Sequence, residues 1–131
     1  MKHMVTLTIT SVLSILFMAF HWADDIVRGM SPGGVSGLGG VLILVIWLYG
    51  TLVLGDRRSG YIIMLIGSLI GLGMPVLHVI GPGGIFQGQI ARSSPAFLFV
   101  WTLHALGVTG MFSFILSVRA LWNRGQSSQQ R

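Results

Sequence analysis

The sequence predicts an all-α membrane protein in which four transmembrane helices form a compact bundle. Apolar residues make up 53% of the chain and charged residues only 8%, whereas soluble domains carry roughly 25% charged residues. Four long apolar stretches lack any charged residue, and about 20 helical residues cross a ~30 Å hydrocarbon core. We expect the four spans at about residues 4–26, 35–55, 60–81 and 95–121.

These spans and their short connections leave no room for a soluble domain. Residues 1–122 are expected to form one transmembrane domain, and residues 123–131 a disordered cytoplasmic tail rich in Gly, Ser and Gln. The absence of cysteine excludes a disulfide and a thiolate metal site. The net charge is +5, but the basic residues are dispersed at span ends. That pattern reflects orientation in a membrane, so we expect no nucleic-acid partner.

The first span has a polar face. Thr6, Thr10, Ser14 and His21 recur at helical spacing, and lipid satisfies neither hydroxyl nor imidazole groups, so this face should contact protein. The apolar stretch is longer than that of a signal peptide and is followed by no clear small-residue cleavage motif. We therefore expect a retained helix.

The second and third spans differ in what they carry. The second contains no Asp, Glu, Lys, Arg or His, so we expect a packing scaffold in which Trp47 has no special role. The third carries Gly67, Gly71 and His78 on one face, and a Gly-x-x-x-Gly pair lets another helix approach closely. His78 should therefore face the interior.

The fourth span places His104 in line with Gly107 and Met111, so His104 is also expected to face the interior.

Lysine and arginine predict the orientation, because cytoplasmic loops carry an excess of them. With both termini inside, six basic residues lie inside and two outside, which favours this N-in/C-in arrangement in the inner membrane of a bacterial-type cell. The inner residues are Lys2, Arg57, Arg58, Arg119, Arg124 and Arg131, and the outer ones are Arg28 and Arg92.

Depth in the membrane suggests which histidines meet. His21 lies three residues before Asp24 and His78 three residues before Gly81, which places both about 5 Å inside the outer boundary. His104 lies ten residues after Ser94, or about 15 Å deep. The His104 side chain would lie level with His21 and His78 only if residues 93–97 lay in the outer headgroup region.

Ionisable residues inside a membrane mark candidate functional sites. His21, Asp24, Asp25 and His78 could bind a transition metal, and His21, His78 and His104 could ligate haem b. The same groups could instead exchange protons or support metal-assisted hydrolysis. Structural roles compete with all of these: an interfacial anchor for His21, an Asp24–Arg28 ion pair, and interhelical hydrogen bonds for the other histidines.

No recognised catalytic signature occurs in the chain, so the sequence leaves open whether it is an enzyme. The function expected first is that of an interaction or accessory subunit, or of a small-ligand-binding membrane protein. The alternative is a haem-binding or transition-metal-binding protein with redox or hydrolytic chemistry. Four helices are few for an independent transporter. The expected partners are the lipid bilayer and either a second copy of the chain or a larger membrane complex.

Overall fold

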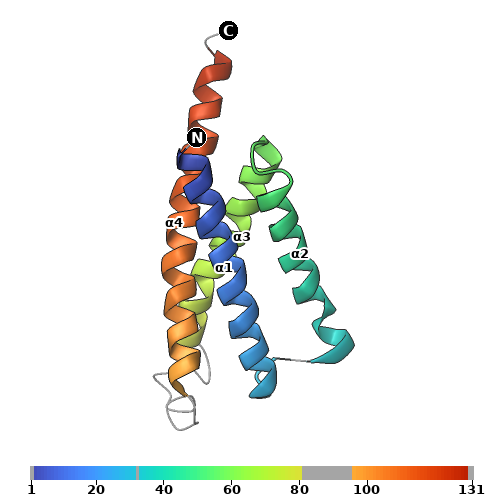
Figure 1. The fold of residues 1–131 in the computed structure, drawn as a ribbon. Helices are drawn as coiled ribbons and strands as arrows, with labels where there is room; N and C mark the ends of the chain where they lie inside the picture. The colour runs from blue at the N-terminus through green and yellow to red at the C-terminus, as the bar shows by residue number, and fades with distance from the viewer. Residues whose placement is uncertain (1, 32, 81–95, 130–131) are drawn as a thin grey trace.

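The computed structural model describes residues 2–31, 33–80 and 96–129, and these are almost wholly helical (Figure 1). The order of elements is α1 (Lys2–Val27), the short 3-10 helix η1 (Gly34–Gly37), α2 (Leu38–Leu52), α3 (Arg58–Ile80) and α4 (Ala96–Gln129). Four helical segments, with η1 counted as part of the second, are long and apolar enough to cross a membrane. Arg92 and Ser94 lie outside the described residues.

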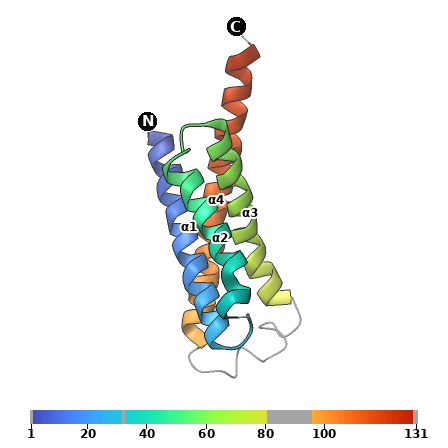
Figure 2. The same cartoon turned by 90° about the vertical axis from the view of Figure 1, so that its right-hand side faces the viewer.

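The helices run in alternating directions, so the start of α1, the turn between α2 and α3, and the end of α4 lie at one end of the bundle (Figures 1 and 2). We call this the terminal end. The opposite, or distal, end holds the end of α1, the end of α3 and the start of α4. Helix α4 packs along both α1 and α3, whereas α2 packs mainly against α3.

Small side chains allow the close packing of α1, α3 and α4. A Cβ atom at Gly110 of α4 would lie 3.4 Å from the Leu72 nitrogen and 3.4 Å from the Ser68 carbonyl oxygen of α3. Such residues let helix backbones approach, which strengthens van der Waals contact where lipid offers no hydrophobic driving force. The fully buried serines are Ser11, Ser14, Ser68, Ser113 and Ser117.

Trp47 joins α2 to the rest of the bundle. Its side chain is only 1% exposed, and its Nε1–H donates to Ser11 Oγ at 3.0 Å. Ser11 Oγ in turn lies 2.8 Å from Thr51 Oγ1, which donates to the Trp47 carbonyl at 2.9 Å. We call Ser11, Trp47 and Thr51 the central cluster. The expectation that Trp47 has no special role is wrong, because its indole N–H needs a partner that α1 supplies.

The glycine face of α3 points inward, as predicted. Gly67 and Gly71 are buried; a Cβ at Gly67 would overlap the Trp47 ring, and one at Gly71 would lie 3.1 Å from Leu106 Cδ1. In the first half of α1, the buried face differs from the predicted one. Thr6 is exposed there, whereas Leu7 and Ser11 are buried.

Helix α4 is longer than the sequence predicts. It continues to Gln129 through the residues expected to form a disordered tail after residue 122. Arg124 ties this extension to the bundle: its guanidinium donates to the Asp56 carbonyl and lies 5.1 Å from the centre of the Tyr61 ring. These contacts join Arg124 of the extension to α3 and to the turn before it.

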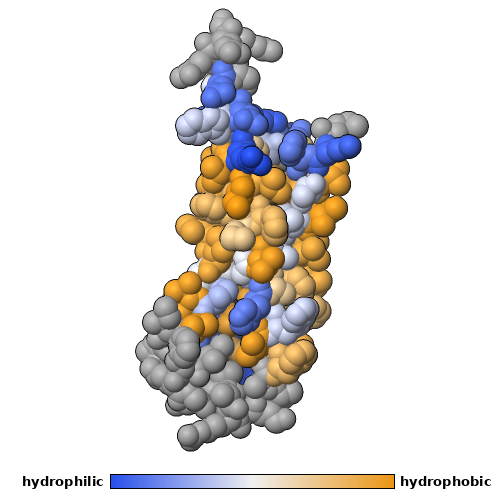
Figure 3. All heavy atoms as spheres, turned by 90° about the vertical axis from the view of Figure 1, so that its left-hand side faces the viewer, coloured by the Kyte–Doolittle hydropathy of each residue, from blue (hydrophilic) through white to orange (hydrophobic). Residues whose placement is uncertain are grey.

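The outer surface suits a hydrocarbon environment. Figure 3 shows a broad apolar band on one face, with hydrophilic side chains gathered above it at the terminal end. Helix α2 presents apolar side chains around most of its circumference, among them Val41, Leu42, Ile43, Val45 and Ile46.

Candidate metal centre

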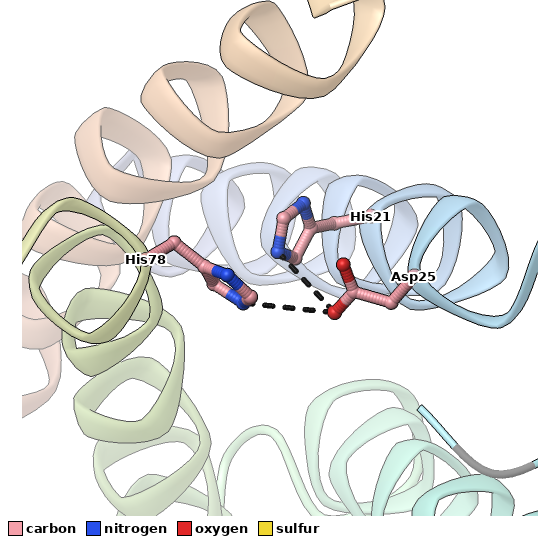
Figure 4. A group of neighbouring side chains, drawn as sticks. All are labelled: His21, Asp25 and His78. Carbon is pink, nitrogen blue, oxygen red and sulfur yellow. Dashed lines mark ion pairs between the residues drawn. The ribbon is translucent and has the colours of Figure 1, made fainter. Parts of the chain in front are cut away.

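Three ionisable side chains converge at the distal end of the bundle (Figure 4). His21 and Asp25 are one turn apart on α1, a spacing that puts both on the same helix face. His78 comes from the last turn of α3, three residues after Pro75, which lies inside that helix. His21 and Asp25 are 0% and 2% exposed, and the His78 side chain is 16% exposed. We call these residues the His–Asp–His cluster.

The end of α1 holds the backbone of Asp25 in place. Met30 and Ser31 both donate their backbone N–H to the Asp25 carbonyl, at 2.8 and 3.2 Å. The chain reverses through Gly29, whose φ of +71° lies in the left-handed region that glycine adopts without strain. The carboxylate therefore projects from a capped helix end rather than from a frayed one.

The distances within the cluster fit a small metal ion. Asp25 Oδ2 lies 3.7 Å from His21 Nε2 and 3.6 Å from His78 Nε2, and one ligand atom from each residue lies within 4.8 Å of the others. Zinc bonds of 2.0–2.2 Å in tetrahedral geometry place neighbouring ligand atoms about 3.3 Å apart. Shifts of a few tenths of an ångström would bring both nitrogens to that distance from the carboxylate.

Hydrogen bonding within the described ranges leaves part of this cluster unsatisfied. Both ring nitrogens of His21 and Oδ1 of Asp25 are buried there without a hydrogen-bond partner. Buried polar groups are normally paired, so each exception requires an explanation. A metal ion bound between His21, Asp25 and His78 would explain why these atoms lack a hydrogen-bond partner.

Phe99 closes the cluster on the side of α4. Its ring centre lies 4.8 Å from that of His21 and 5.3 Å from that of His78, and its side chain is fully buried. The Arg28 guanidinium stands over the same ring at 5.3 Å. Sequence reasoning missed Phe99, although its spacing to Leu103 and Leu106 marks the buried face of α4.

Asp24 lies beside the cluster but is engaged elsewhere. Its Oδ2 accepts a hydrogen bond from Arg28 Nε at 2.7 Å, the ion pair that the i,i+4 spacing allows. Of the two acidic residues considered as metal ligands, the structure brings only Asp25 into the group with His21 and His78.

His104 does not join the other histidines. Its side chain is exposed on α4, and Nδ1 lies 2.7 Å from the Val100 carbonyl oxygen. The expectation that it faces the interior is wrong, because the buried face of α4 follows other positions. These are Phe99, Leu103, Leu106, Gly110, Ser113 and Ser117, spaced by four and three residues in turn.

This geometry distinguishes a site for a single metal ion from a site for haem b. The rings of His21 and His78 are 4.7 Å apart between centres and nearly perpendicular, which leaves no room for a porphyrin between them as axial ligands. Two imidazoles and a carboxylate are a common ligand set for a transition metal, with further positions open to water or substrate. The cluster therefore fits a single metal ion better than haem b.

Neither a family model, nor a curated protein, nor a solved structure matches this chain.

Proposed function

We propose that this chain is a small multi-pass membrane protein that binds one divalent transition-metal ion through His21, Asp25 and His78. The observation that carries the proposal is the convergence of three buried or partly buried ligand groups within 4.8 Å of one another. Zinc, copper, iron and nickel suit imidazole ligands, whereas calcium and magnesium prefer sites made of oxygen atoms. An open coordination position would let the ion bind a small ligand or activate water.

We further propose that both termini face the cytoplasm of a bacterial-type cell and that the cluster lies near the outer face of the inner membrane. The distribution of basic residues supports this orientation: Lys2, Arg57, Arg58, Arg119 and Arg124 belong to the terminal end, and Arg28 to the distal end. Excess positive charge favours the cytoplasmic side. The ion would then enter from outside the cell.

Cysteine labelling tests this orientation. The chain contains no cysteine, so a single one introduced by Ser31→Cys or Gln126→Cys reports one position alone. An impermeant thiol reagent on intact cells should label the first variant and not the second. The opposite labelling would place the His–Asp–His cluster near the cytoplasm.

Metal binding is tested by titrating purified protein with Zn²⁺, and with Co²⁺ as a spectroscopic probe. We expect one ion per chain, and a loss of affinity of more than about 100-fold for His21→Ala and for His78→Ala, because changes outside the ligands themselves already cost 10–100-fold. His104→Ala is the matched control and should bind normally. Equal affinity for all three variants would refute the metal site. A Soret band that His104→Ala abolishes would support haem instead.

An accessory role in a membrane assembly is the second candidate, and His104 favours it. Its imidazole is exposed on a face of α4 that otherwise presents Trp101, Val108 and Met111. Its Nδ1 contacts the Val100 carbonyl of the same helix; lipid cannot pair with the other ring nitrogen, whereas a neighbouring helix can. Oxidation of a His104→Cys variant in membranes should give a cross-linked dimer if the partner is a second copy. Leu69→Cys, on an exposed face of α3, is the control.

A further inference from the structure

A pocket of about 370 Å³ opens at the terminal end, between the first turns of α1 and the last part of α4. It lies at the opposite end of the bundle from the His–Asp–His cluster. Its lining residues are His3, Met4, Leu7, Leu116, Arg119, Ala120 and Asn123.

The pocket has an apolar wall and a polar rim. Leu7 is buried, and Met4, Leu116 and Ala120 pack beside it as partly buried side chains. The Tyr61 hydroxyl approaches Met4 Sδ at 2.6 Å, so a contact from α3 holds one side of the wall.

The rim is basic. His3, Arg119 and Asn123 are exposed and can all donate hydrogen bonds. Among the residues that the structure describes, the lining includes no acidic side chain. The rim therefore favours an anion, and the guanidinium of Arg119 matches the geometry of a phosphate group, which it can bind through two parallel hydrogen bonds.

Two observations suggest that the pocket lies near the depth of a lipid headgroup. Trp122, 68% exposed, directly precedes Asn123, and exposed tryptophans concentrate at the boundary between hydrocarbon and water. The apolar band ends towards the terminal end, where the hydrophilic surface begins (Figure 3). A free anion would use only the rim, whereas an amphiphile would use both the rim and the apolar wall.

We propose that this pocket binds an anionic phospholipid, with the headgroup phosphate at Arg119, His3 and Asn123 and the start of an acyl chain against Leu7 and Leu116. Basic pockets between transmembrane helices on the cytoplasmic side are suited to such headgroups, and this step rests on the orientation proposed above. The site is independent of the metal cluster, so either proposal can fail alone.

The test is native mass spectrometry of the detergent-solubilised chain with phosphatidylglycerol or phosphatidylcholine. Wild type should retain one phosphatidylglycerol molecule in preference to phosphatidylcholine. Arg119→Gln should weaken retention about fivefold to tenfold, in line with the contribution of one arginine near a lipid surface. Arg58→Gln removes a charge at the same end outside the pocket lining and should leave retention unchanged.

Two further measurements distinguish the effect of the pocket's shape from that of its charge, and the binding of a lipid from that of a free anion. Ala120→Leu keeps every charge but fills the pocket, and should weaken phosphatidylglycerol retention while circular dichroism still reports a folded helical protein. Inorganic phosphate at millimolar concentration should not displace the lipid. Equal effects of Arg58→Gln and Arg119→Gln, no preference for the anionic lipid, or full displacement by phosphate would each overturn the proposal.

Discussion

Two groups of buried polar side chains lie at different depths of this bundle, and they differ in how well they are paired. In the central cluster, the Trp47 indole donates to Ser11, Ser11 bonds to Thr51, and Thr51 donates back to α2. In the His–Asp–His cluster, both nitrogens of His21 and one oxygen of Asp25 are buried without a hydrogen-bond partner among the described residues.

The contrast supports a structural role for the central cluster and the metal-binding role that we propose for the His–Asp–His cluster. A buried polar network whose members are all paired makes a packed interior more specific and needs no further explanation. Ionisable groups that are buried without a hydrogen bond are more costly than a buried serine hydroxyl, so helix packing alone does not account for His21 and Asp25. This difference, more than the residue types alone, directs the search for function to the distal end.

The largest effect should come from truncating the central cluster. Trp47→Ala removes the ring that fills the space between α1, α2 and α3, and should lower the free energy of unfolding by about 3–5 kcal/mol. Unfolding in mild detergent with increasing denaturant measures this. Trp47→Phe, which keeps most of the ring, should lose clearly less. Equal losses would show that the hydrogen bond, rather than packing, holds α2.

The His–Asp–His cluster should respond to metal instead. Zn²⁺ at about 100 times its dissociation constant should stabilise wild type by about 2.7 kcal/mol, because an ion that binds only the folded state shifts the unfolding equilibrium. His21→Phe should gain nothing from Zn²⁺, and without the ion it should be about as stable as wild type or more so, because it removes two buried nitrogens that lack a hydrogen bond. A marked loss of stability without metal would make His21 a structural residue like Trp47.

Overpacking the glycine face should come next. A side chain at Gly67 would overlap the Trp47 ring, so Gly67→Leu should lower the free energy of unfolding by about 1–3 kcal/mol. Leu69→Ala, on an exposed position of α3, is the control and should have little effect. Comparable losses would mean that the wrong face of α3 has been placed inward.

The smallest effect compares two buried serines. Ser11→Ala leaves the Trp47 N–H without its partner and should reduce stability by about 1 kcal/mol. Ser113 Oγ is buried without a hydrogen-bond partner in the described part of the chain, so Ser113→Ala should change the free energy of unfolding by only a few tenths of a kcal/mol. Equal losses in the same denaturant assay would remove the distinction between paired and unpaired hydroxyls on which the comparison rests.

Helical rise and period allowed parts of the arrangement to be predicted. Counting residues from the ends of two spans placed His21 and His78 at one level, and the structure places their rings 4.7 Å apart. The four apolar stretches likewise led to four helices long and apolar enough to cross a membrane. Both inferences depend on distances along one helix, which the sequence determines directly.

Inferences about helix faces were less successful, because they depend on the neighbouring helix as well. On α4, the stripe through His104, Gly107 and Met111 and the stripe through Leu103, Leu106 and Gly110 are displaced by one residue, or about 100°. Only the packing against α1 and α3 decides between them. The importance of Trp47 and Phe99 likewise comes from what they contact across the bundle: the spacing of Phe99 to Leu103 and Leu106 matches the buried face of α4, but it does not reveal the contacts with His21 and His78.

Pro75 is a point in α3, about one turn before His78, at which the helix bends more easily. Proline cannot donate the backbone hydrogen bond that would otherwise reach the Gly71 carbonyl. The final turn of α3 is therefore joined to the rest of the helix by fewer bonds, and tilting it strains the helix less than bending an unbroken one. His21 and Asp25, in contrast, share a continuous helix. If the cluster binds the metal ion that we propose, the ion could enter or leave when this one turn tilts, without separation of the four helices.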